Sequence, residues 1–136
     1  MEKQVLPGLK LTFLIHCIVA LIVGLILVVV PQFWATLFGQ SITDVAPYRV
    51  LGAAILAFGV SSWWAYRETL WQHVRIVTEM EVVWTVLGAL ITIYALLFES
   101  MITAGWLMAI VLALFAVAFV YYYVREGAST AQPLTR

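Results

Sequence analysis

Four long apolar segments, almost free of charged residues, constrain this chain more than any other feature of its sequence. An α-helix rises about 1.5 Å per residue, so about 20 residues cross a hydrocarbon core of roughly 30 Å. Each segment is close to this length, and Pro31 ends the first of them. The sequence therefore predicts four transmembrane helices, at about residues 11–30, 47–66, 80–98 and 101–124.

The composition agrees with a protein that is solvated largely by lipid. Apolar residues make up 65% of the 136 residues and charged residues only 10%, whereas a soluble domain is roughly a quarter charged. Seven acidic and seven basic side chains are too few to cover such an apolar chain. We expect an all-α integral membrane protein, a four-helix bundle in one domain (1–136) with a polar tail at 126–136, and the lipid bilayer as its main partner.

The basic residues predict the orientation of the bundle. Short loops rich in Lys and Arg remain in the cytoplasm. Of the seven basic residues, only Arg49 falls on the opposite side from the other six in the predicted topology. We therefore expect both termini to be cytoplasmic, and the membrane to be the prokaryotic cytoplasmic membrane. The six residues on the cytoplasmic side are Lys3, Lys10, Arg67, Arg75, Arg125 and Arg136.

The first and second loops have apolar residues at helical spacing. In the first loop, Phe33-Trp34 and Leu37-Phe38 precede Gly39, which predicts a short interfacial helix, and Asp44 is an expected N-cap of the second span. In the second loop, residues 69–72 and 78–81 each resemble a capping box. We assign a short interfacial helix to this loop as well, although one long helix from about residue 70 fits the same residues.

Small residues at every fourth position predict which helix faces pack closely, because helices in lipid associate through close approach of their backbones. We expect each such face to look into the bundle or at another subunit. In the second span, Gly52 and Gly59 leave a second flat strip on the helix surface, next to the series of small residues at every fourth position. The series are Thr12, His16, Ala20 and Gly24 in the first span, Ala53, Ala57, Ser61 and Ala65 in the second, and Gly105, Ala109 and Ala113 in the fourth.

His16 is the most informative polar residue within the predicted spans. It lies six positions after Lys10, which places it roughly 9 Å below the cytoplasmic boundary. Polar groups at such a depth usually face protein and often carry function. Two hypotheses follow: a ligand or proton site built on His16, or a structural hydrogen bond between helices, which we favour. The residues at comparable depth, and so the candidate partners or ligand-binding residues, are Ser61, Ser62, Thr85 and Tyr121.

Glu79 and Glu81 stand at the cytoplasmic mouth of the predicted third span. Two carboxylates there suggest a cation or proton site, but a spacing of two points them to different faces of a helix. Acidic residues in a first turn also stabilise the helix dipole, and Glu81 would complete a capping box. We therefore favour a structural role, within a charged rim that also includes Arg67 and Arg125.

Several chemistries lack the residues that they need. One cysteine and two histidines cannot build a structural zinc site, and no phosphate-binding loop, catalytic triad or basic tract for nucleic acid is visible. We therefore expect no metal, no cofactor and no nucleic-acid partner. A transmembrane haem would need two axial imidazoles, which His16 could supply only if two chains each contributed one.

Three classes of function remain open. The one that we favour is an accessory or assembly protein that acts through helix contacts with itself, as a homo-oligomer, or within a larger membrane complex. The alternative is a binder or carrier of a small apolar or lipid-like molecule in an inner-leaflet polar pocket around His16. An intramembrane enzyme or a haem-binding subunit is the third, and only His16 supports it.

Overall fold

The computed structural model describes residues 3–99 and 104–130, and all of its regular elements are helices. Three of them are long and apolar enough to cross a membrane: Pro7–Val29, Trp71–Phe98 and Gly105–Gly127. The protein is thus helical, with three apolar helices of membrane-spanning length in the described part of the chain. The elements are α1 (Pro7–Val29), α2 (Pro31–Leu37), α3 (Ala46–Arg67), α4 (Trp71–Phe98) and α5 (Gly105–Thr130).

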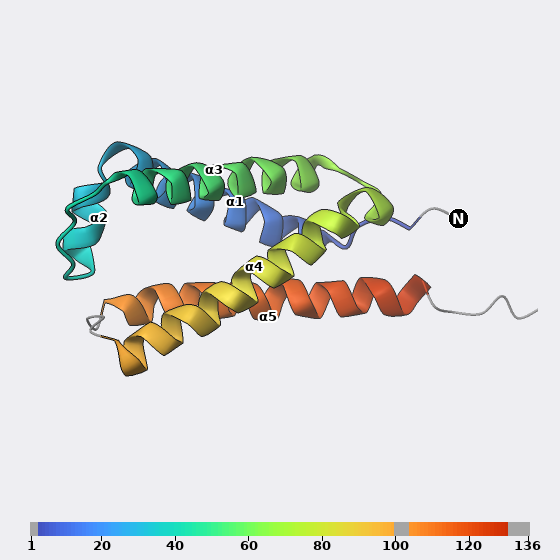
Figure 1. Ribbon diagram of the computed structural model, residues 1–136. Helices are drawn as coiled ribbons and strands as arrows, with labels where there is room; N and C mark the ends of the chain where they lie inside the picture. Colours follow the sequence, from blue (N-terminus) through green and yellow to red (C-terminus); the bar gives the residue numbers. More distant parts are fainter. Residues whose placement is uncertain (1–2, 100–103, 131–136) are drawn as a thin grey trace, which may run out of the picture.

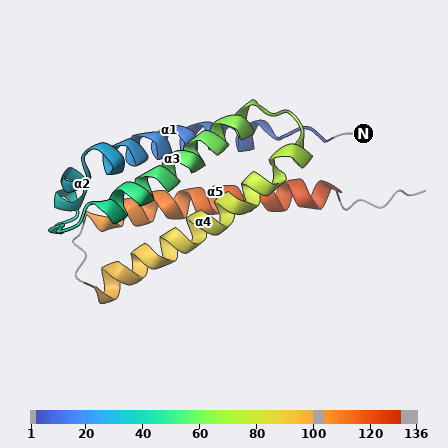
Figure 2. The same cartoon turned by 45° about the horizontal axis from the view of Figure 1, so that its top comes forward.

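The four long helices form two antiparallel hairpins, α1 with α3 and α4 with α5 (Figure 1). The start of α1, the α3–α4 connection and the end of α5 lie together at one end, here called the terminal end; α2 marks the other. The hairpins meet mainly near the terminal end, and α4 diverges from α3 toward the α2 end (Figure 2). The core at the terminal end comprises Val5, Leu9, Phe13, Ala65, Trp71, Val74 and Phe119.

Glycines bring α1 and α3 into direct backbone contact. A Cβ atom added to Gly24 would lie 2.7 Å from Cγ of Leu56, and one added to Gly52 would lie 2.8 Å from Cβ of Leu27. Neither distance is compatible with a side chain, so the two helices approach as closely as glycine allows. The predicted face of α1 is confirmed: its four residues, from Thr12 to Gly24, are all buried.

The small-residue prediction for α3 is correct only in part. Ala53 and Ala57 are exposed, and the face against α1 is instead the neighbouring strip with Gly52, Gly59 and Ser62. Both strips contain small residues at helical spacing, so the sequence could not distinguish them. In α5, Gly105 and Ala109 are buried as predicted, and Ala113 is half-buried.

The second loop contains no separate interfacial helix, so that prediction is wrong: α4 is a single helix from Trp71 to Phe98. Its buried residues recur every three or four positions across the predicted break, and no Gly or Pro lies between Trp71 and Glu81. The predicted capping boxes do not form either, because Leu70 is the N-cap and provides no side-chain bond. The buried residues are Trp71, Val74, Thr78, Glu81, Thr85 and Ala89.

The first loop contains the predicted helix, α2. It ends before Gly39, whose φ of 68° is one that residues with a Cβ atom rarely adopt. Asp44 stands one residue before the N-cap Val45, and its Oδ1 atom accepts the Ala46 N–H at 2.9 Å. Asp44 therefore accepts a hydrogen bond from the start of α3, but it does so from the residue before the N-cap and is not the N-cap itself.

A clasp of hydrogen bonds closes the terminal end, and we define it by Lys3–Leu6, Thr69–Trp71 and Glu126. The Trp71 N–H donates to the Lys3 carbonyl and the Val5 N–H to the Thr69 carbonyl, both at 2.9 Å. Glu126 is fully buried; its carboxylate accepts the Leu6 N–H at 2.8 Å and pairs with Nζ of Lys3 at 2.7 Å. Residues 126–130 of the expected polar tail continue α5, while 131–136 lie outside the described residues.

Candidate functional site

A buried chain of three polar side chains joins α1, α3 and α4. Nδ1 of His16 lies 2.9 Å from Oγ of Ser62, and the Ser62 hydroxyl donates to Oε1 of Glu81 at 2.8 Å. Nδ1 of His16 is 3.5 Å from the same Oε1 atom. All three residues are buried, and Oε2 of Glu81 has no hydrogen-bond partner among the described residues. The Gly24–Gly52 contact holds α1 and α3 close enough for the hydrogen bond between His16 and Ser62 to form.

Glu81 is the largest departure from the sequence-based interpretation. It was expected to cap the third span at a solvated rim, but α4 begins ten residues earlier, so Glu81 lies inside the bundle and is completely buried. Burying a carboxyl group is costly unless it is hydrogen-bonded. Ser62 provides one bond and His16 stands close by, so the three residues form a unit.

The predicted polar layer is only partly assembled. The structure brings His16 and Ser62 together, but the Ser61 hydroxyl donates to the Phe58 carbonyl of its own helix at 2.8 Å. Thr85 is buried, and its hydroxyl likewise donates within α4, to the Glu81 carbonyl at 2.6 Å. Tyr121 is exposed on the outside of α5, so its expected inward position is wrong. The hydroxyl groups of Ser61 and Thr85 thus donate their hydrogen bonds within their own helices, as hydroxyl side chains in helices commonly do.

Of the four residues predicted to form a charged rim, Glu79 is bonded to Arg75 and Tyr123, and not to any of the other three. Oε1 of Glu79 accepts bonds from Nε of Arg75 at 2.8 Å, within α4, and from the Tyr123 hydroxyl at 2.9 Å, which links α4 to α5. Arg67 is exposed at the end of α3. Nη1 of Arg125 donates to the Tyr121 hydroxyl at 2.8 Å on the outer face of α5.

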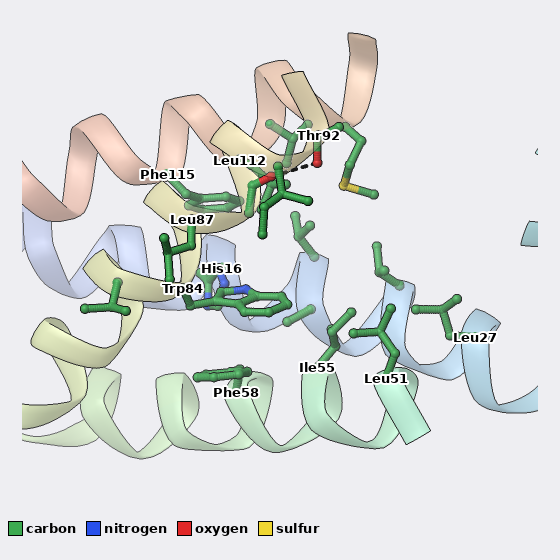
Figure 3. Close-up of a pocket in the computed structure, with 18 of the residues that line it drawn as sticks. His16, Leu27, Leu51, Ile55, Phe58, Trp84, Leu87, Thr92, Leu112 and Phe115 are labelled. Carbon is green, nitrogen blue, oxygen red and sulfur yellow. Dashed lines mark hydrogen bonds between the residues drawn. The ribbon is translucent and has the colours of Figure 1, made fainter. Parts of the chain in front are cut away.

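A cavity of about 800 Å³ occupies the space between the two hairpins (Figure 3). It extends from His16 toward α2, which contributes Trp34, and all four long helices line it. Almost all of the lining is apolar; the titratable side chains in it are His16 and Glu79, and no Lys or Arg is present. Of the five residues predicted to bind a ligand, only His16 reaches the cavity.

Aromatic rings form much of the inner part of this cavity. Phe58 of α3 and Trp84 of α4 stack with their ring centroids 5.1 Å apart and bridge the two hairpins, as Figure 3 shows. The His16 ring meets Phe115 edge to face, with centroids 4.9 Å apart. The imidazole is therefore held by Ser62 at one nitrogen and by aromatic packing around its ring.

The cavity opens sideways between α3 and α4. Its lining includes Leu51 on α3 and Ile76, Val83 and Ile91 on α4, all of which are also exposed on the surface. These side chains form the two edges of an opening where the helices diverge. A molecule can therefore enter from the flank of the bundle, without passing through the clasp.

Sequence reasoning missed the cavity and its aromatic residues. Trp34 was assigned to the short interfacial helix of the first loop, and Trp84 and Phe58 were not singled out, because nothing in their spacing shows that the hairpins diverge. The ten-residue extension of α4 could have been inferred from the uninterrupted series from Trp71 to Ala89.

Within residues 3–99 and 104–130, no group of three or more His, Cys, Asp or Glu side chains is arranged to hold a metal ion. The arrangement can instead bind an apolar molecule and place one polar group of it against His16. Comparison of the chain with protein-family models, curated proteins and solved structures finds no match.

Proposed function

We propose that this protein binds a small apolar or lipid-like molecule in the cavity between its two hairpins. The observation that carries the proposal is the cavity itself: about 800 Å³, lined almost entirely by apolar side chains, with His16 at its inner end. Ligand sites commonly have volumes of about 300–1,000 Å³, an apolar lining and a few placed polar groups. The sideways opening between α3 and α4 suits a ligand that arrives from the bilayer.

We further propose that α3 is the fourth transmembrane helix and that both termini are cytoplasmic. α3 has 22 residues, about 33 Å of helix, and it packs antiparallel along α1, so the two helices share one depth. Its polar residues are compatible with this depth, because Ser61 and Ser62 are hydrogen-bonded and Arg49 lies in the first turn. The cavity then runs from the inner leaflet toward the outer one.

Cysteine labelling tests this topology. In a Cys17→Ser background, Gln40→Cys should react with an impermeant thiol reagent added to intact cells, because Gln40 is exposed near α2. Gln72→Cys and Ser129→Cys should react only after the membrane is permeabilised, since six of the seven basic residues are on that side. Labelling of residue 129 from outside would mean an odd number of spans or an inverted protein, and either would refute the proposed topology.

Native mass spectrometry from mild detergent tests ligand binding. We expect the wild-type protein to retain a molecule of lipid-like mass, and Val23→Trp to retain at least about tenfold less, because the indole would fill a cavity that Val23 lines. Ile22→Trp is the matched control, since Ile22 is exposed and outside the cavity lining. Equal retention by both variants would contradict the proposal.

A second candidate is an accessory or assembly protein, and the outward strip of α3 favours it. Ala53 and Ala57 are exposed one turn apart, which leaves a surface where another helix could approach closely. The same mass spectra report the number of subunits. An oligomer would support this candidate without excluding a ligand, and a strictly monomeric protein would weigh against self-association.

A further inference from the structure

We propose that the cavity selects a neutral amphiphile whose polar head is a hydrogen-bond donor, such as a long-chain alcohol or an alkylphenol, and that Nε2 of His16 accepts this bond. The inference rests on the proposed ligand-binding function and names the chemistry of the head group. It follows from the direction of the hydrogen bonds in the His16–Ser62–Glu81 chain.

The Ser62 hydroxyl determines the state of the histidine. A hydroxyl group has one hydrogen to donate, and that of Ser62 goes to Oε1 of Glu81 at 2.8 Å. An ionised Glu81 carboxylate can only accept, so with Glu81 ionised the contact of 2.9 Å between Ser62 Oγ and His16 Nδ1 has Nδ1 as the donor. In a neutral imidazole with its hydrogen on Nδ1, Nε2 has a free lone pair and acts as an acceptor.

Nε2 is also the nitrogen that remains available to a ligand. His16 lines the cavity, and among the described residues no hydrogen bond to Nε2 is formed. Among the described residues, the buried side-chain atoms without a hydrogen bond are one oxygen of Glu81 and one oxygen of Glu126, the latter ion-paired with Lys3. Nε2 is not one of these atoms, so it is not sealed in the protein interior. An acceptor at the inner end of an apolar cavity matches a ligand with one donor at the end of an apolar body.

The charges around the cavity disfavour an anionic head group. No Lys or Arg lines it, so a fatty acid or a phospholipid phosphate would lack an opposite charge. Glu79, at the edge, is already bonded to Arg75 and Tyr123. A hydroxyl group needs no counter-charge and can bond Nε2 directly.

Three brominated probes of equal chain length test the head group. They are 11-bromoundecan-1-ol, its methyl ether and 11-bromoundecanoic acid, added to the protein in lipid nanodiscs. Bromine quenches tryptophan fluorescence on contact, and Trp34 and Trp84 line the cavity. We expect the alcohol to bind about five- to tenfold more tightly than the ether, the effect of one net hydrogen bond.

Variants show whether the preference for the alcohol over the ether depends on His16 or on neighbouring residues. His16→Phe should bind alcohol and ether equally, and Ser62→Ala should reduce the preference because Nδ1 loses its anchor. Ser61→Ala should keep the wild-type preference, since Ser61 bonds only within its own helix. If His16→Phe does not fold, ¹⁵N NMR of the histidine ring in His73→Asn, which leaves one histidine, reports directly which nitrogen of His16 carries the hydrogen.

The outcomes distinguish this inference from the proposed function. Absence of saturable quenching by every probe would overturn ligand binding itself. Equal binding of alcohol and ether by the wild-type protein would overturn only the head-group inference. So would tightest binding of the acid at alkaline pH, where it is a carboxylate, or an NMR spectrum with the hydrogen on Nε2, because both require Nε2 to be a donor.

Discussion

Gly52→Val should lower the free energy of unfolding by at least about 3 kcal/mol, a large effect for one small substitution. A Cβ atom at position 52 would lie 2.8 Å from Cβ of Leu27 and 2.9 Å from the Gly24 carbonyl oxygen, so α1 and α3 must move apart. The separation would also lengthen the contact between His16 and Ser62. Thermal or denaturant unfolding in detergent measures the loss.

Ala54→Leu is the matched control for this substitution. It adds the same number of carbon atoms to the same helix, but Ala54 is exposed, so the free energy of unfolding should change by no more than about 0.5 kcal/mol. If the two variants were equally stable, the close contact of α1 with α3 at Gly52 would be wrong.

Lys3→Met should be the most damaging change at the terminal end. It leaves the fully buried Glu126 carboxylate with the Leu6 N–H and without its cation, and an unpaired buried charge costs about 3 kcal/mol or more. Glu126→Gln should cost less, because the amide oxygen can still accept the Leu6 N–H and the partly exposed Lys3 can reach water. Unfolding in detergent measures both variants.

The double variant Lys3→Met/Glu126→Leu shows whether the two residues act together. Removing both charges takes away the uncompensated carboxylate, so this protein should be more stable than Lys3→Met alone. Additive losses would mean that Lys3 and Glu126 contribute independently, which the distance of 2.7 Å between them argues against.

The local features that were predicted correctly are those that depend on periodicity. The α1 face through Thr12, His16, Ala20 and Gly24 could be predicted because each small or polar residue follows the last by one turn. The helix before Gly39 could be predicted for the same reason. For α3, two overlapping strips of small residues met the same criterion, and only contact with α1 selects the one with Gly52.

The errors arose where distant segments meet. The clasp joins Lys3 and Leu6 to Glu126, so nothing near residue 126 in the sequence shows that its side chain is buried. Glu81 was assigned to a cap because a capping pattern and an acidic residue coincide there, but α4 begins ten residues earlier, at Trp71, whose N–H donates to the carbonyl of the distant Lys3. The cavity depends on the angle between two hairpins, which no local pattern encodes.

The clasp also constrains the order in which the chain can assemble. Its partners, Lys3 and Glu126, are 123 positions apart, so the ion pair forms only after nearly the whole chain has been synthesised and inserted. The α1–α3 hairpin needs no later segment for its glycine contacts and can therefore pack first. We expect the α4–α5 hairpin to dock against it afterwards, with the burial of Glu126 as the last step. We expect a ribosome-bound chain that ends before α5 to contain a packed first hairpin and a free N-terminal arm.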